Sequence, residues 1–470
     1  MSTVQDTIAR YQEAYRWMLS FVKDPTGRIE MRDRSREERI AEYRERYAHM
    51  RAFLDFAGNP EAGFKSVHIA GTSGKGSVTV MISALLTACG QVTGDHTSPF
   101  LQLPNEKLRV DGEMIAPSDF VEITDQLRKL VEAWQAEGNA FLYAHGWAAL
   151  TFLWFNYAQV DWGVYETGVG GRLASSNLMP AEIAVITNVD YDHLKTLGPT
   201  LEGIAWHKAG IIRPNKPAVT TETKPHILDI MYREAAEKNA TLYECDYEIE
   251  PSGELTVRTP HQTFSGIRSN LRGKYQLINA ALSITAVDIL AHQFGFTLDQ
   301  QAIETALNSL VYAGRFEAVQ QSPTVILDGA HNPAKMRAFV NSVRQAYPDR
   351  KAAILIGKLA TKDGSEMLQA LLPIAKRFVA TEPRVYAKFP TPAADLAATL
   401  RRLAPDVPVS IEPIVAKAVA DTLQTLSDDE LFIITGSIYM VGAAREHWHD
   451  SSQRLVELEQ QKRALDHINN

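Results

Sequence analysis

The chain has 470 residues, of which 45% are hydrophobic and 22% charged, and its formal net charge is -8. This length predicts roughly two to four globular domains, and the acidic balance argues against a nucleic-acid binder, which needs a basic face for phosphate contacts. The two cysteines exclude a disulfide framework, so we expect a reducing, cytoplasmic setting.

The N-terminal segment, residues 1–65, is predicted to be largely helical. Its first residues lack the apolar run of a signal peptide. Charges of both signs in residues 28–51 are typical of a solvent-exposed helix face. The longest apolar stretch, residues 147–155, is too short to span a bilayer and predicts a buried helix. We therefore expect no membrane association.

From residue 66 onward, predicted strands alternate with predicted helices, and the rhythm restarts after residue 312. The strands are expected at 66–70, 160–168, 182–189, 324–332, 352–359, 377–383, 407–413 and 430–437, and the helices at 77–89, 199–209, 225–238 and 275–293. Such alternation predicts an α/β protein whose mainly parallel sheets are covered by helices on both faces. We expect one domain over residues 1–311, a second over 312–470 and a hinge between them. From residue 446 we expect a charged helical tail that is solvent-exposed, the alternatives being that it packs on the domain or mediates self-association.

The stretch from Gly71 to Ser77, GTSGKGS, follows a predicted strand and opens a predicted helix. This order suits a phosphate-binding loop, because glycines let backbone N–H groups approach an anion at a helix N-terminus. The spacing is shorter than the usual G-x-x-x-x-G-K-[ST] pattern. Lys75 could offset phosphate charge and Ser77 could bind Mg²⁺. The alternative is a glycine-rich turn with an unrelated lysine.

Polar residues also follow the next strands, where ligands sit in open α/β sheets. Glu166 ends a buried strand, so it needs a partner, either a metal ion or an arginine. His193 follows Asp192 and is either a metal ligand or structural. Lys208 lies among apolar residues and is either a reactive amine or an ordinary solvated lysine.

The predicted second domain begins with a similar set of polar residues. Asp328 and His331 follow its first predicted strand, so both are expected at the functional edge of its sheet. Arg315 lies near the expected hinge, from which an arginine could reach a phosphate across a cleft.

Nine motifs in the chain carry a resemblance to one family. They are GTSGKGS, TSPFLQLPNEKLRVDGEMI, ETGVGGRL, DHLKTLG, KAGI, QLINA, GRFE, DGAHNP and ITGSIYMVG, spread over roughly residues 50–445. In this order they resemble folylpolyglutamate synthases and dihydrofolate synthases, the folate branch of the ATP-dependent Mur ligase superfamily. The resemblance implies an N-terminal P-loop-type ATPase domain, a Rossmann-like C-terminal glutamate-ligase domain, and a cleft that closes between them.

The resemblance also implies an activity and a set of site residues. The activity is ATP-dependent addition of L-glutamate to the carboxylate of a folate through an acyl phosphate. The implied ATP-binding residues are Thr72, Ser73, Gly74, Lys75, Gly76, Ser77, Asn279 and Arg315; the metal ligands for two Mg²⁺ sites are Ser77, Glu166, His193 and Lys208; and the catalytic residues are Lys75, Lys208, Asp328 and His331. Lys208 matches a lysine that CO₂ carboxylates in this family.

The acceptor side departs from the family pattern. The expected acceptor-binding residues are Thr97, Ser98, Phe100 and Tyr143. The departures are Phe100 for a histidine, Ala144 for a glutamate, Ala174 for an aspartate, Ser176 for a threonine and Lys388 for an arginine. Two alternatives therefore stay open: a Mur-type ligase acting on a different carboxylate, and an ATP-binding protein without turnover. We expect small-molecule substrates, no nucleic acid, no membrane and a monomer.

Overall fold

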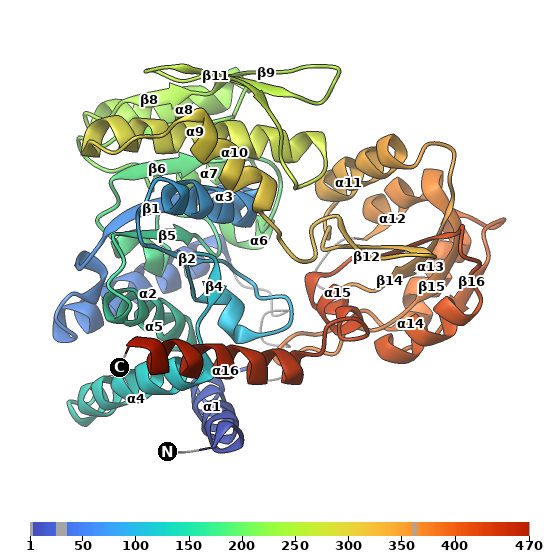
Figure 1. The fold of residues 1–470 in the computed structure, drawn as a ribbon, viewed down its shortest axis with the longest axis horizontal. Coiled ribbons are helices and arrows are strands. Elements are labelled where there is room, and N and C mark those ends of the chain that lie inside the picture. Colours follow the sequence, from blue (N-terminus) through green and yellow to red (C-terminus); the bar gives the residue numbers. More distant parts are fainter. Residues whose placement is uncertain (1–2, 25–34, 361–363, 470) are drawn as a thin grey trace.

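The computed structural model describes residues 3–24, 35–360 and 364–469. Two β-sheets lie side by side, each covered by helices, and a linker after α10 joins them (Figure 1). The α/β class and the mainly parallel sheets predicted from the sequence are confirmed. The boundary expected at residues 311 and 312 lies in that linker, between the last helix of the first part and the first strand of the second.

The larger sheet has eight strands in the order β4-β3-β2-β5-β1-β6-β7-β8. Their bounds are β1 Lys65–Ala70, β2 Thr93–His96, β3 Arg109–Val110, β4 Glu113–Met114, β5 Trp162–Glu166, β6 Ile183–Ile186, β7 Ala218–Thr220 and β8 Leu242–Glu244. The central strand β1 pairs in parallel with β5 and β6. Only the β2–β3 and β3–β4 pairings are antiparallel among the described strands of this sheet. The carboxyl ends of β1, β5 and β6 therefore open at one edge.

Helices cover both faces of the larger sheet. On one face lie α3 Lys75–Ala88, α9 Lys274–Phe294 and α10 Gln300–Ser309; on the other lie α1 Val4–Leu19, α2 Arg36–Phe56, α4 Pro117–Ala136, α5 Tyr143–Tyr157, α6 Leu194–Leu197, α7 Leu201–Ala209 and α8 Pro225–Glu237. Alternate strand residues separate these cores. Val67 and Ile69 face α3 and α9, whereas Ala184 and Ile186 face α7 and α8.

Helix α9 is long and apolar enough to cross a membrane by length and composition, the one such helix among the described residues. Within this fold, however, 72% of its most apolar window is buried. It packs against α3 and forms part of the core. A core helix passes the same test as a membrane span, so this finding is weak evidence for a membrane.

A small antiparallel sheet beside α9 was not predicted. Its strands are β9 Asp246–Ile249, β10 Leu255–Arg258 and β11 Thr263–Ile267, in the order β11-β10-β9. In this sheet, Leu255 and Val257 of β10 and Ile267 of β11 are fully buried in the core that includes α9. Short strands with so few apolar residues give a weak alternation signal.

The second sheet has six strands in the order β12-β13-β17-β14-β15-β16, all parallel except β12. The bounds are β12 Glu317–Gln321, β13 Thr324–Asp328, β14 Ala352–Ile356, β15 Ala375–Ala380, β16 Val409–Ile411 and β17 Leu431–Thr435, with helices α11 Pro333–Ala346, α12 Ser365–Leu371, α13 Ala393–Leu403, α14 Val415–Gln424 and α15 Ile438–Arg445. The five strands predicted after residue 312 are confirmed. Short 3-10 helices occur at Pro60–Ala62, Pro104–Lys107, Ser175–Leu178 and Leu372–Ile374.

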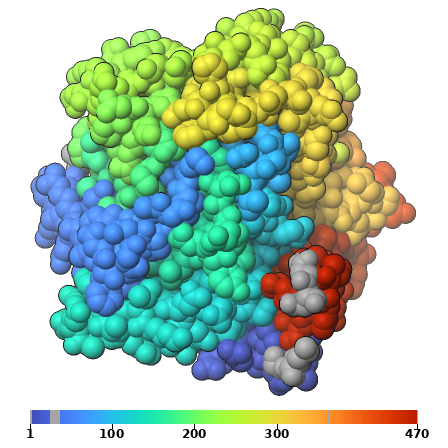
Figure 2. Space-filling view, turned by 60° about the vertical axis from the view of Figure 1, so that its left-hand side comes forward, coloured from blue at the N-terminus to red at the C-terminus, as the bar shows by residue number. Residues whose placement is uncertain are grey.

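The C-terminal helix α16, Ser451–Asn469, leaves the second sheet and packs on the first part of the chain. It lies against α1 and α4, and Figure 2 shows its red end beside the dark blue N-terminal helix. Leu458 and Glu459 are buried there. The Glu459 carboxylate accepts hydrogen bonds from the Ser118 backbone N–H and from Arg463. The expectation of a solvent-exposed tail is wrong, because this helix completes a hydrophobic core.

The charged N-terminal run also contributes to that core. Residues 28–34 lie outside the described residues, and the remainder of the run forms most of α2. Near its end Met50, Phe53 and Leu54 are fully buried. The mixed charges thus mark one exposed face, while the last turns of the helix pack inward.

Candidate active site

The loop between β1 and α3 is held by the loop that follows β6. The Ser73 backbone N–H donates to Asn188 Oδ1 at 2.9 Å, and Thr187 Oγ1 donates to the Ser73 carbonyl at 2.6 Å. Thr72 and Asp190 exchange hydrogen bonds of 3.0 Å. Sequence reasoning missed this bracing, although the polar residues just after β6 were the available signal. The loop is thereby fixed in shape.

Two glycines leave room beside this loop for side chains from other segments. Gly74 begins α3 with φ +86°, and a Cβ atom there would lie 2.5 Å from Asn279 Oδ1. A Cβ atom on Gly76 would lie 2.4 Å from the Tyr312 hydroxyl and 3.4 Å from Glu166 Oε2. The residue after Lys75 is therefore glycine because a tyrosine and a carboxylate approach the helix at that point. The same contacts place Asn279 and Glu166 beside the loop.

Lys75 is the first residue of α3, and its Nζ donates to the Gly71 carbonyl at 3.1 Å. Glu166 is 2% exposed and accepts a hydrogen bond from the Ser98 backbone N–H, rather than from an arginine. Burial raises the pKa of Glu166, and the Lys75 charge opposes that rise. Ser77 is buried in the same first turn. The four residues form one compact region at the carboxyl edge of the sheet.

Lys208 lies in α7 and is only 3% exposed. Burial holds the pKa of its amine well below the usual range, and Lys75 and Lys335 lower it further. Asp192 acts in the opposite direction. Lys335 belongs to α11 of the second sheet and was not predicted as a site residue. Three lysines from both parts of the chain therefore come within electrostatic reach of one another.

His193 caps the short helix α6 with a left-handed backbone, φ 51°, and its imidazole is 43% exposed. Its Nε2 lies 3.9 Å from Asp192 Oδ1. Since Asp192 also influences Lys208, His193 lies on the same side of the site as that lysine. Its imidazole is accessible from the site rather than buried in the core.

Asp328 ends β13 and is buried, which raises its pKa. Its two oxygens accept hydrogen bonds from the backbone N–H groups of Phe316, at 2.9 Å, and Ala330, at 2.8 Å. Arg315 opposes the pKa rise of both Asp328 and Glu166. The charge of this arginine therefore acts on carboxylates from both sheets.

His331 begins the turn that leads into α11. Its Nδ1 lies 2.9 Å from the Gly329 carbonyl, and its Nε2 lies 3.3 Å from Lys335 Nζ. The Asn332 side chain caps α11 by accepting from the Lys335 backbone N–H at 2.9 Å. His331 and Lys335, four residues apart at a helix start, therefore act as a pair, and this spacing was the signal that sequence reasoning overlooked.

The expected acceptor residues have different surroundings. Thr97 is buried, donates to the Glu106 carbonyl at 3.3 Å and accepts from Arg109 at 3.3 Å. Ser98 contributes its backbone to Glu166, and Phe100 is half-buried in the same loop. Tyr143 begins α5, where burial raises the pKa of its phenol. The Thr97 side chain and the Ser98 backbone N–H are therefore already used in hydrogen bonds within the protein.

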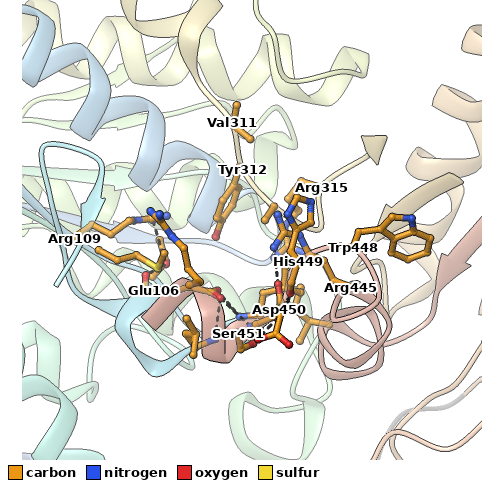
Figure 3. A pocket seen from close by; sticks show the side chains of 18 of the residues that line it. Glu106, Arg109, Val311, Tyr312, Arg315, Arg445, Trp448, His449, Asp450 and Ser451 are labelled. Atoms are coloured by element: carbon orange, nitrogen blue, oxygen red, sulfur yellow. Dashed lines mark hydrogen bonds between the residues drawn. The ribbon is translucent and has the colours of Figure 1, made fainter. Parts of the chain in front are cut away.

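A cavity of about 500 Å³ lies between the two sheets (Figure 3). Its walls come from the loop after β2, the linker, and the segment that joins α15 to α16. Arg445 pairs with Glu317 at 2.9 Å and donates to Gln102 at 2.5 Å, and Gln102 donates to the His449 carbonyl at 2.8 Å. These bonds tie the second sheet to the loop after β2 beside the predicted site.

The oxygen-bearing side chains at one position in the site suit a hard cation. Glu166, buried beside Ser77 and the phosphate-binding loop, supplies carboxylate oxygens of the kind that Mg²⁺ prefers. No group of three or more His, Cys, Asp or Glu side chains is arranged to hold a metal in the described ranges. A metal at this point would therefore complete its coordination with hydroxyl, water or phosphate oxygens, as Mg²⁺ commonly does.

Comparison with known proteins accounts for this arrangement. Residues 148–287 match the Mur ligase middle domain, and residues 314–438 match the Mur ligase glutamate ligase domain. A dihydrofolate synthase/folylpolyglutamate synthase of Bacillus subtilis is 31% identical over 408 residues, which cover 84% of this chain and 93% of the relative. The family resemblance expected from the nine motifs is confirmed.

Solved structures agree with the sequence comparison. Folylpolyglutamate synthase of Mycobacterium tuberculosis, complexed with ADP and AMPPCP, is 28% identical with a TM-score of 0.81, covering 95% of this chain and 100% of that one. Escherichia coli FolC, in complex with DHPP and ADP, is 26% identical with a TM-score of 0.75, covering 87% and 93%. The chain therefore belongs to the folylpolyglutamate synthase/dihydrofolate synthase family of the Mur ligase superfamily, whose members are ATP-dependent ligases that form amide bonds.

Proposed function

We propose that this chain uses ATP to add L-glutamate to the carboxylate of a folate. The observation that carries the proposal is the position of Lys208. Its buried amine interacts electrostatically with Lys75 of the phosphate-binding loop and with Lys335 of the second sheet. Positive groups gather in this way where phosphate and carboxylate charges must be held together. The folate and the glutamate are inferred from the relatives, which are folylpolyglutamate and dihydrofolate synthases.

The reaction has two steps. The γ-phosphorus of ATP is transferred to an oxygen of the folate carboxylate, the bond to the bridging oxygen breaks, and ADP leaves. The glutamate nitrogen then attacks the acyl carbon, phosphate departs with the bonding electron pair, and the nitrogen loses a proton. Lys75 and Arg315 offset the negative charge on the transferred group. His331 and Lys335 lie on the opposite sheet, where they would orient the incoming glutamate.

The proposed cofactor is Mg²⁺, held by Glu166, Ser77 and His193. When bound, such a cation neutralises phosphate charge and polarises the oxygens it contacts. The raised pKa of Glu166, caused by its burial, supports this assignment, because a carboxylate that is costly to ionise alone gains from a nearby cation. Asn279, beside Gly74, is proposed to contact the adenine.

Lys208 is proposed to be carboxylated. Its lowered pKa increases the fraction of neutral amine, and only the neutral amine reacts with CO₂, forming a carbamate and releasing a proton. The product anion would lie near Lys75 and Lys335, whose charges favour it. Incubation with ¹³C-labelled bicarbonate should give a carbamate carbon resonance that the Lys208→Met variant lacks. A wild-type spectrum without that resonance would contradict the modification while leaving the ligase proposal intact.

A different carboxylate acceptor is the second candidate. It is favoured by the acceptor side, where Phe100 and Ala174 replace polar family residues and the Thr97 side chain is used within its own loop. Ser176 instead makes a contact of 3.0 Å with the buried His68. A pocket with fewer polar groups satisfies a different set of polar ligands.

An acceptor panel tests both candidates. Purified protein is incubated with ATP, Mg²⁺, L-glutamate and one acceptor at a time: tetrahydrofolate, dihydropteroate, or a peptide carboxylate. Phosphate release is followed, and product mass identifies the glutamyl adduct. We expect release that depends on both the folate and glutamate. Release with only a non-folate acceptor would establish the second candidate, and nucleotide binding without release under any condition would identify a non-catalytic ATP-binding protein.

A further inference from the structure

Tyr312 occupies the linker between the two sheets, three residues after the end of α10. It borders the cavity between the sheets, and Figure 3 shows its ring between Arg109 and Arg315. The ring centroid lies 5.8 Å from the Arg109 guanidinium carbon and 5.5 Å from that of Arg315. Both distances are within the range of a cation–π contact.

The hydroxyl end of Tyr312 reaches the phosphate-binding loop. It lies so close to Gly76 that a Cβ atom there would be 2.4 Å from the hydroxyl oxygen, and Glu166 approaches the same point. Tyr312 and Thr97 both line the cavity. Burial raises the pKa of Tyr312, so the phenol stays protonated at neutral pH. One side chain therefore touches the first turn of α3 at its tip.

Arg315 is held by contacts from both parts of the chain. Its charge acts on the carboxylates of Asp328 and Glu166. Its Nη1 lies against Gly329, where a Cβ atom would be 2.4 Å away, and contacts the Gly314 carbonyl at 3.4 Å. The Tyr312 ring adds a cation–π contact to this side chain, which lines the cavity.

We propose that Tyr312 is a positioning residue for the ligase reaction, holding Arg315 over the first turn of the phosphate-loop helix. The inference rests on the proposed function only for the role of Arg315 at the transferred phosphate. The ring orients the guanidinium, and the hydroxyl, which lies against Gly76, fixes the ring relative to the first turn of α3. Because Tyr312 lies on the linker, any movement of one sheet relative to the other would move this anchor.

The test is a double-mutant cycle between Tyr312 and Arg315. Tyr312→Leu removes the ring, Tyr312→Phe removes only the hydroxyl, and Arg315→Ala removes the guanidinium. We expect kcat to fall about 30-fold for Tyr312→Leu and about tenfold for Tyr312→Phe. In the Arg315→Ala background, neither change at Tyr312 should lower kcat by more than about twofold. Such non-additivity separates positioning through Arg315 from a general structural role.

The control is Tyr232→Phe, which removes a hydroxyl bonded to Glu244 at 2.6 Å on the exposed helix α8. It should leave kcat unchanged. Thermal unfolding of each variant checks folding, and Tyr312→Phe keeps the volume of the site if Tyr312→Leu does not fold. Full additivity with Arg315→Ala, or a kcat for Tyr312→Phe within twofold of wild type, would overturn the proposal.

The cycle is also measured on AMPPCP affinity, which requires no acceptor. If no folate supports turnover in the wild type, the proposed substrate fails, but coupling between Tyr312 and Arg315 still appears in nucleotide binding. If the wild type turns over folate and the cycle is additive in both kcat and AMPPCP affinity, the positioning role fails alone. The two failures are therefore distinguishable.

Discussion

The two faces of the larger sheet are built in different ways. On the α3 face, the loop that opens α3 follows β1 directly, and its hydrogen-bond partners come from the segment after the neighbouring strand β6, as with Ser73 and Asn188. On the opposite face, α1 and α4 are completed by α16. Ser118 and Glu459, 341 residues apart, are bonded there, as are Thr7 and Arg463, 456 residues apart.

The difference offers a physical reason for the expectation that the nucleotide side follows the family pattern while the acceptor side departs from it. A loop that must present backbone N–H groups to a phosphate tolerates few residue types at each position. A helical layer needs only apolar residues of suitable volume, supplied from any part of the chain. Changes on the α3 face should therefore affect catalysis, and changes on the α16 face should affect stability.

The largest effect is expected for Lys75→Ala on the α3 face. Loss of the ammonium that balances phosphate charge should lower kcat by about 10³-fold, because such preorganised charges dominate phosphoryl transfer. Acceptor-dependent phosphate release measures the effect, with the exposed Lys129→Ala on α4 as control. Full turnover by Lys75→Ala would remove the central role given to this loop.

Substitution of Lys208 should distinguish effects on catalysis from effects on stability most clearly. Lys208→Met keeps the length of the side chain but cannot be carboxylated, so kcat should fall at least about 100-fold. Since a buried amine is replaced by an apolar chain, the free energy of unfolding should stay equal or rise by up to about 2 kcal/mol. Denaturant unfolding checks this. A variant that loses stability together with activity would contradict the assignment of Lys208 to chemistry.

On the α16 face, Leu458→Ala should lower the free energy of unfolding by about 2–4 kcal/mol, because the leucine is 4% exposed and its removal leaves a cavity. The KM for ATP should stay within about twofold of wild type. Thermal unfolding and steady-state kinetics measure both quantities. Leu465→Ala on the same helix, at a 58% exposed position, is the control and should change neither.

The smallest effect concerns how the free energy of unfolding depends on pH through the contact between α4 and α16. Burial raises the pKa of Asp119 to about 6, although Lys462 lies 3.7 Å away. The folded state therefore binds this proton more tightly than the unfolded state, and the contribution to stability is lost as pH rises from about 4 to about 6. Partial exposure keeps this contribution below about 3 kcal/mol.

Asp119→Asn should remove that pH dependence. Unfolding experiments at a series of pH values between 4 and 7 measure it, and Glu122→Gln, an exposed change on the same helix, is the control. An unchanged pH profile in Asp119→Asn would show that another group is responsible.

Much of the fold could be predicted from the sequence, and the reasons are visible in particular elements. The strands β13 and β17 are short, nearly continuous apolar runs, which indicate strands buried on both faces. The strands β1 and β5 mix apolar and polar residues and are marked by the glycine-rich loops that follow them. The sheet β9–β11 gave too weak a pattern, and α16 was wrongly expected to be solvated because its charges outnumber its buried residues. Periodicity describes one segment at a time and does not show what covers it.

The candidate site likewise contains residues that local sequence could predict and residues that it could not. Lys75, Glu166 and Asp328 could be chosen from the sequence because each follows a strand that must be buried. Lys335 and Tyr312 could not, because their importance depends on distances between segments far apart in the chain.

By itself, the sequence determined the α/β class, the glycine-rich loop between β1 and α3 and the family, because these depend on local residue order. Only the tertiary structure decided that α16 closes a core of the first part, that Lys208 lies near two other lysines, and that Tyr312 joins the loop to Arg315. Such contacts depend on burial and on the meeting of distant segments, and a linear pattern records neither.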